Sequence, residues 1–242
     1  MALVVSVYVP SGIVMAADSR LIVRRTEDRE ENGVKVRAEQ HLVFSDNSNA
    51  VVRLRRVPFG VSVYDAGVIN NETIESHVYR FESEVLDEGD DIDAVADKLM
   101  AYFQHRHPGI AVGFHLAGYR TQGRSREPVV LVGHTTRETK IRRVNAGESG
   151  EAQYGVVRAG DTTVANRLID PKHLPLFAAM PLQDAIDYAI HLIRTTIETL
   201  RFEPRFPTVG GPIDVLVIRP DGPRWIQRKD LHGESPGSPL PL

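Results

Sequence analysis

The stretch LVVSVYVPSGIVMAADSR, residues 3–20, decides how this chain begins to fold. It holds two runs of residues that favour β-strands, residues 3–9 and 13–17. Between them, Pro10-Ser11-Gly12 is typical of a turn. The stretch therefore predicts a β-hairpin that starts almost at the first residue.

Beyond the hairpin, the chain alternates between blocks of strands and blocks of helices. The charged residues 24–40 predict a solvated loop or a protruding hairpin. Apolar residues at helical spacing predict helices after Asn70-Asn71, after Asp90, from near Asp161 to before Pro171, and from Pro181 onward. Further strands are predicted over residues 50–54, 60–64, 110–114, 129–132, 141–144, 154–157, 213–219 and 225–227.

The order is strands, two helices, strands, two helices, strands, without an internal repeat or linker. Two sheets packed face to face, with helix pairs outside, would bury both kinds of apolar face. We therefore expect an α+β fold, a four-layer αββα sandwich, as one domain over residues 1–229. The tail, residues 230–242, is rich in Pro, Gly and Ser and is expected to be disordered.

The composition excludes several classes of function. Hydrophobic residues make up 42% and charged residues 25%, the mix of a soluble globular protein. The net charge of -3 provides no basic field to attract nucleic acid. Without cysteine there is no disulfide framework and no thiolate zinc site. No run of 18 apolar residues could span a membrane, and the start lacks the basic residues of a signal peptide. We expect a cytoplasmic protein.

Two local patterns are weak signals for binding. His105 and His107 are spaced by one residue, which without further ligands is poor support for a metal site. The basic cluster of Arg53, Arg55 and Arg56 is more typical of a solvated turn than of a nucleic-acid patch. Neither a metal nor a cofactor is predicted.

Three segments resemble the β subunits of proteasomes. They are the opening hairpin with its Ala-Ala-Asp-x-Arg ending, FGVSVYDAGVINNETIE (residues 59–75), and VGGPIDVLVIRPDG (residues 209–222). With the element order, the resemblance covers about residues 2–228. It implies the αββα sandwich of N-terminal-nucleophile hydrolases.

The resemblance also implies a mechanism. In that family the hydroxyl of a threonine, exposed as the first residue, attacks a peptide carbonyl, and its own α-amino group takes the proton. That amine suits the task because its unperturbed pKa of about 7.7–8.0 lies near neutrality. A lysine favours the ionised nucleophile, an aspartate orients the lysine, and a backbone N–H stabilises the oxyanion.

The roles carry over by position once Gly12 and Asp18 are aligned with the family's hairpin. The nucleophile then falls on Ala2, which is expected to become the first residue after removal of the initiator methionine. The orienting aspartate falls on Asp18 and the arginine after it on Arg20. The lysine position falls on Ala50, if the charged stretch before it is an insertion.

The remaining family positions match less clearly. The oxyanion glycine falls around Tyr64 or Asp65, and the serine close to the nucleophile falls near Asp161, which is equally typical of a helix cap. A supporting aspartate expected before Gly210 has no match in residues 205–208.

Alanine at both positions predicts an inactive chain, because a methyl group cannot attack a carbonyl. If residues 24–40 are not an insertion, Lys35 is the nearest lysine. Arg53 is a poor substitute because it faces away from residue 50 on an alternating strand and stays charged. The chain is therefore either a natural pseudoenzyme or one silenced by paired alanine substitutions.

The leading hypothesis is a self-assembling subunit of threonine-type peptide or amide hydrolase lineage, in homo-oligomeric or stacked rings, with peptide as a possible ligand. The runner-up is a non-catalytic structural or peptide-binding module, whose pocket around Ala2 would be filled or blocked. A third hypothesis is an amidohydrolase with Ser6 or Ser11 as nucleophile, although neither has an obvious base partner in the sequence.

Overall fold

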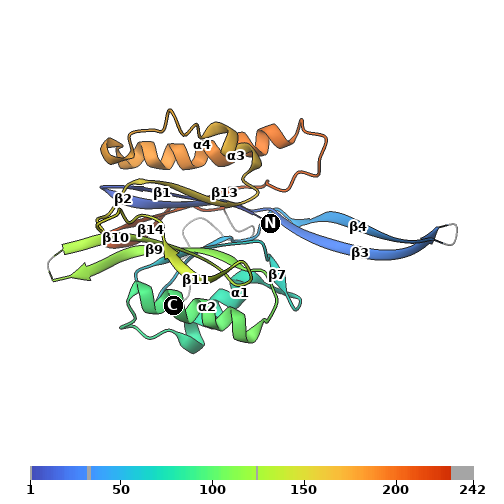
Figure 1. The fold of residues 1–242 in the computed structure, drawn as a ribbon, viewed down its shortest axis with the longest axis horizontal. Coiled ribbons are helices and arrows are strands. Elements are labelled where there is room, and N and C mark those ends of the chain that lie inside the picture. Colours follow the sequence, from blue (N-terminus) through green and yellow to red (C-terminus); the bar gives the residue numbers. More distant parts are fainter. Residues whose placement is uncertain (1, 32–33, 124, 230–242) are drawn as a thin grey trace, which may run out of the picture.

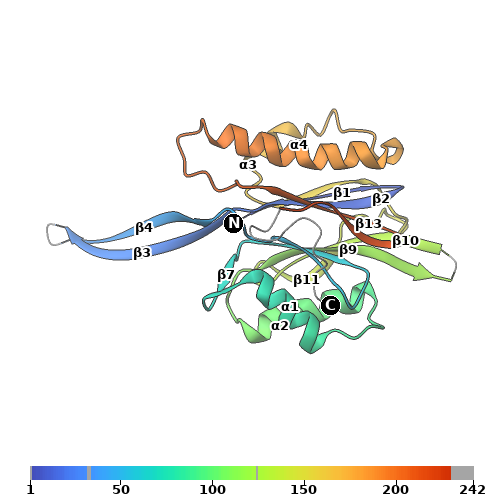
Figure 2. The same cartoon turned by 180° about the vertical axis from the view of Figure 1, so that it is seen from behind.

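Two five-stranded sheets pack face to face between two layers of helices (Figures 1 and 2). The structure is a computed structural model that describes residues 2–31, 34–123 and 125–229. The four layers confirm the predicted αββα sandwich.

The upper sheet of Figure 1 has the order β12-β1-β2-β13-β14, and the lower sheet has the order β11-β10-β9-β6-β5. The upper strands are β1 (Leu3–Val9), β2 (Gly12–Asp18), β12 (Gly155–Gly160), β13 (Ile213–Arg219) and β14 (Gly222–Gln227). The lower strands are β5 (Val51–Arg53), β6 (Gly60–Tyr64), β9 (Gly113–Gln122), β10 (Ser125–His134) and β11 (Glu138–Arg143).

Helices cover the outer face of each sheet (Figure 1). The upper sheet is covered by α3 (Thr163–Leu168) and α4 (Leu182–Leu200), and a 3₁₀ turn, η1 (Phe177–Ala179), lies between them in sequence. The lower sheet is covered by α1 (Ile74–Val85) and α2 (Ile92–Arg106), after a short ribbon of β7 (Val68–Ile69) and β8 (Glu72–Thr73). None of the described helices is long and apolar enough to cross a membrane.

The opening hairpin is apolar at nearly every position because it is covered on both sides. Val5 and Val7 belong to the cluster packed under α4, whereas Val4 and Tyr8 belong to the cluster between the two sheets. Every residue of β1 and of β2 is buried. Antiparallel pairing of β1 with β2 and of β2 with β13 makes this hairpin the centre of the upper sheet.

The charged stretch forms a long hairpin that leaves the body (Figures 1 and 2). Its strands, β3 (Leu21–Glu31) and β4 (Val34–Ser45), pair with each other and with neither large sheet. The alternative of a protruding hairpin is therefore confirmed. The hairpin lies between Asp18 and Ala50 in sequence.

Several predicted boundaries differ from the structure; Pro181, for example, is the N-cap of α4 and not its first residue. Thr73, not the Asn70-Asn71 pair, caps α1 by accepting a hydrogen bond from the Ser76 backbone N–H, and both asparagines adopt left-handed turn conformations. Asp91 caps α2, and its neighbour Asp90 binds Lys98 instead.

The strand predicted at residues 110–114 begins only at Gly113. Ile110 lies before it with 40% of its surface exposed, and its carbonyl accepts a bond from the Thr135 hydroxyl. The predicted disorder of residues 230–242 lies outside the described residues.

A buried ion pair fastens the end of the described chain. The Lys229 ammonium, which follows β14, binds the Asp214 carboxylate and donates to Asn49 Oδ1 at 2.7 Å. The side chains of Lys229 and Asp214 are only 5% and 2% exposed. Asn49 precedes the lower sheet and Asp214 belongs to the upper one, so this Lys229 latch joins the two sheets.

Replacing Asp214 with alanine is expected to lower the free energy of unfolding by about 3–5 kcal/mol, because the Lys229 charge stays buried without its anion. Asp221→Ala, which removes the exposed partner of Arg224, should cost about 1 kcal/mol or less. Urea denaturation of the two variants and the native chain measures both values. Equal losses would contradict the latch.

Candidate active site

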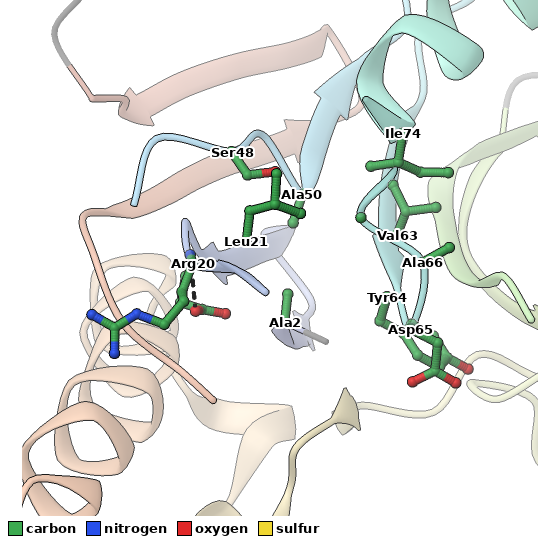
Figure 3. A pocket seen from close by; sticks show the side chains of 12 residues that line it. Ala2, Arg20, Leu21, Ser48, Ala50, Val63, Tyr64, Asp65, Ala66 and Ile74 are labelled. Atoms are coloured by element: carbon green, nitrogen blue, oxygen red, sulfur yellow. Dashed lines mark hydrogen bonds between the residues drawn. The ribbon is translucent and has the colours of Figure 1, made fainter. Parts of the chain in front are cut away.

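A small pocket lies where the start of β1 meets the lower sheet (Figure 3). Ala2, Asp18 and Ala50 all line it, so the structure brings together three positions that are far apart in sequence. Its volume is about 20 Å³, room for little more than one water molecule.

Asp18 is the polar centre of this pocket and is 1% exposed. Its Oδ1 accepts the Leu3 backbone N–H at 2.7 Å, and its Oδ2 accepts those of Gly210 at 2.8 Å and Arg20 at 3.2 Å. The carboxylate therefore binds the first strand, the turn after β2 and the segment before β13.

Burial has a large effect on this carboxyl group. It raises the pKa of Asp18 to about 7, against the three backbone N–H groups, which favour the charged form. No lysine is bonded to Asp18 among the described residues.

Ala2 and Ala50 are buried on the walls of the pocket, at 8% and 6% exposure. Ala2 is held in place by the pairing of the adjacent Leu3 with Gly160. Gly160 has φ of 86°, and a β-carbon there would lie 1.6 Å from the carbonyl oxygen of Ala2, so only glycine fits.

Arg20 lines the pocket, but its guanidinium is already engaged. Nε and Nη2 donate to the two oxygens of Asp46 at 2.7 and 2.9 Å, and Nη1 donates to the carbonyl of Pro207 at 3.1 Å. A bidentate pair of this kind fixes the side chain. Arg20 therefore connects the base of the long hairpin to the segment before β13, and its guanidinium is not a free cation in the pocket.

Tyr64 and Asp65, the expected oxyanion positions, also line the pocket (Figure 3). Asp65 has φ of 71°, the left-handed conformation that favours glycine. Its carboxylate accepts His134 Nε2 at 2.9 Å and Arg137 at 3.0 Å, and these bonds hold the strained turn. His134 Nδ1 accepts the Arg137 backbone N–H, so Nε2 carries the hydrogen.

Gly67 is the glycine of the pocket, and sequence reasoning missed it. A β-carbon at Gly67 would lie 2.1 Å from Cδ1 of Leu21, so the side chain of Leu21 occupies the space next to this backbone. The Ala66-Gly67 pair could have indicated it, because Gly67 lies three positions beyond the end of β6.

Asp161 does not line the pocket. It accepts hydrogen bonds from Arg205 Nη1 at 2.6 Å and from the Thr208 hydroxyl. Burial opposes its charge, but bonds from Arg205, Thr208 and Thr163 lower the pKa of Asp161 to about 2. The segment 205–208, which offers no matching aspartate, thus supplies partners for Asp161.

The two alternative cations lie elsewhere. The backbone of Lys35 is in β4, in register with that of Glu30 near the far end of the protruding hairpin. Arg53 lines a different cavity, beside Trp225. Neither belongs to the pocket around Ala2.

Ser6 has a base partner after all, contrary to the expectation. Its hydroxyl lies 3.0 Å from His115 Nδ1, and burial lowers the pKa of His115 to about 3. Ser6 and His115 are 0% and 1% exposed, so a substrate has no access to the pair. Ser11, in the hairpin turn, is exposed.

The described residues contain no group of three or more His, Asp or Glu side chains placed to hold a metal ion. The ring of His107 packs edge-on against that of His77, with centroids 4.5 Å apart.

No protein-family model and no curated protein matches this sequence. Among solved structures, the Anbu (Gly-1) mutant from Hyphomicrobium sp. strain MC1 is similar, with a TM-score of 0.58 and 16% sequence identity. The match covers 95% of this chain and 86% of that one. At this identity the likeness shows the fold alone, the four-layer αββα sandwich.

The raised pKa of Asp18 predicts that part of the stability falls as pH rises. Between about pH 4 and pH 7 the folded chain holds a proton that the unfolded chain has lost, so folding becomes less favourable with rising pH. Relative to Asp18→Asn, which does not titrate, the native chain should lose about 1.4 kcal/mol per pH unit in this window. Urea denaturation at several pH values measures the difference, and a constant difference would contradict the prediction.

Proposed function

We propose that this chain is a proteasome-like subunit of threonine-type hydrolase lineage that assembles with copies of itself and does not turn over substrate. The observation that carries the proposal is the pocket shared by Ala2, Asp18 and Ala50. The expected nucleophile and lysine positions are both buried there, beside the expected aspartate, and both hold alanine. The fold of the Anbu structure supports the same lineage.

The pocket of this chain lacks the two groups that the chemistry needs. Alanine at residue 2 has no oxygen to attack a carbonyl, and alanine at residue 50 places no positive charge beside Asp18. The hydroxyl of Ser48, which also lines the pocket, has no histidine or lysine bonded to it within the described residues. Removing a nucleophile leaves at most about 10³–10⁴-fold acceleration from binding and the oxyanion site.

The size of the pocket favours a second candidate, a non-catalytic structural or peptide-binding module on the same fold. A volume of about 20 Å³ cannot admit a peptide side chain, and Leu21 fills the space beside Gly67. A filled pocket around Ala2 is the feature expected of such a module.

Activity measurements separate the two candidates. The chain as written should hydrolyse none of a set of fluorogenic peptides above the buffer rate. Ala2→Thr with Ala50→Lys should gain hydrolysis if the lineage proposal holds, because it supplies the hydroxyl and the cation beside Asp18. Mass spectrometry first establishes that residue 2 of the variant carries the free amine.

Matched variants make the result interpretable. Ala2→Val with Ala50→Met adds similar bulk without the reactive groups, and it should remain inactive. Adding Leu21→Ala to the restored variant opens the pocket and should raise hydrolysis further. Robust hydrolysis by the unaltered chain would refute the proposal. If none of the restored variants hydrolyses peptide, the non-catalytic module is favoured.

Self-assembly is tested separately. Large apolar side chains are exposed on the single chain, including Phe44 at 71%, Leu176 at 75% and Phe202 at 85%. Contacts between copies would cover such surfaces. Light scattering after size-exclusion chromatography should give a mass that is a multiple of the 26.9 kDa of one chain. A single-chain mass at micromolar concentration would contradict assembly.

A further inference from the structure

A second cavity lies where the edge strands β5 and β14 of the two sheets come together beside α1. It has a volume of about 340 Å³. Its lining residues are Arg53, Arg55, Tyr79, Trp225 and Arg228. They come from the end of β5, the turn after it, α1, β14 and the residues just after β14. Two arginines of the basic cluster, Arg53 and Arg55, are thus joined by a third arginine and two aromatic rings from distant parts of the chain.

The three arginines of this cavity carry charge that the described residues do not neutralise. None of them has an ion pair within that part of the chain, although many other arginines do. The nearby carboxylates are engaged elsewhere. Glu75 accepts the Tyr79 hydroxyl at 2.9 Å and Asn49 Nδ2 at 2.6 Å, and Glu82 accepts the backbone N–H groups of the turn that carries Arg55.

Two of these cations are held against aromatic rings. The guanidinium carbon of Arg55 lies 5.9 Å from the ring centroid of Tyr79, and that of Arg228 lies 5.1 Å from the ring centroid of Trp225. Such contacts restrict the long arginine side chains before any ligand arrives. Less conformational entropy is then lost when the guanidinium groups bind an anion.

We propose that this cavity binds a small anion that carries an aromatic base, of the nucleotide class. Guanidinium groups bind phosphate oxygens in a bidentate manner, and they also stack on planar rings. Aromatic side chains provide stacking faces for bases. The volume lies within the range of small-molecule sites, and an adjoining cavity of about 290 Å³ shares Arg55 and Tyr79.

The proposed site is connected to the Lys229 latch. The Tyr79 hydroxyl donates to Glu75, Asn49 donates to the other oxygen of Glu75, and Lys229 donates to Asn49. A ligand at the cavity therefore contacts one end of a hydrogen-bonded chain that joins the two sheets. Because it binds the folded chain alone, it should also raise the melting temperature.

Trp225 is the single tryptophan of the chain, so its fluorescence reports on this cavity alone. We expect ADP to change the emission with a saturable titration curve. Adenosine lacks the phosphate groups and inorganic pyrophosphate lacks the base, so each should bind at least about tenfold more weakly than ADP. Pyrophosphate binding as tightly as ADP would overturn the nucleotide assignment, and the absence of a saturable change with ADP would overturn the site.

Matched variants localise the binding. Arg55→Gln with Arg228→Gln should weaken ADP binding by about a hundredfold, because each lost charged contact accounts for about tenfold. Arg224→Gln is the control, since Arg224 lies next to Trp225 on β14 but pairs with Asp221 and does not line the cavity. Thermal melts establish that both variants fold. Unchanged ADP affinity in the folded double variant, or an equal loss in the control, would refute the assignment.

Discussion

The carboxylate of Asp18 is the constraint on which the rest of the pocket depends. It gathers backbone N–H groups from Leu3, Arg20 and Gly210, which belong to three separate segments of the chain. Buried backbone donors without acceptors are costly, so these segments converge wherever this acceptor lies. The start of β1, the root of the long hairpin and the entrance to β13 are thereby held around one point. The walls on which Ala2 and Ala50 lie follow from that convergence.

The aspartate of this pocket can have two roles: it can accept backbone hydrogen bonds, and it can support a catalytic lysine. In the proposed lineage, the aspartate at this place orients a lysine. Here the three backbone N–H groups still need the carboxylate as their acceptor, whereas Ala2 supplies no nucleophile and Ala50 supplies no cation. Under the proposed function, the architecture is retained without the reactive groups.

Local patterns in the sequence predict much of the fold but little of what holds the site. The apolar runs around Pro10-Ser11-Gly12 and the stripe along α4 are periodic, so the element order and the layers could be predicted. The start of a helix was harder to predict, because adjacent polar residues could each cap it. Asp91 caps α2, whereas Asp90 binds Lys98. The partners of Asp161 at residues 205–208 and the latch between Lys229 and Asp214 join distant segments, and no local pattern reveals them. Ala50 could be placed only by treating the charged stretch as an insertion, an assumption that the β3–β4 hairpin supports.

The protruding hairpin has a consequence for how the molecule moves through solvent. Strand β3 has 11 residues, which at about 3.3 Å each make an arm of roughly 35 Å. An arm of that length adds little mass but sweeps a large volume as the particle tumbles. A single chain therefore experiences more drag than a sphere of the same mass, and it should sediment slowly and elute early, as a larger particle would.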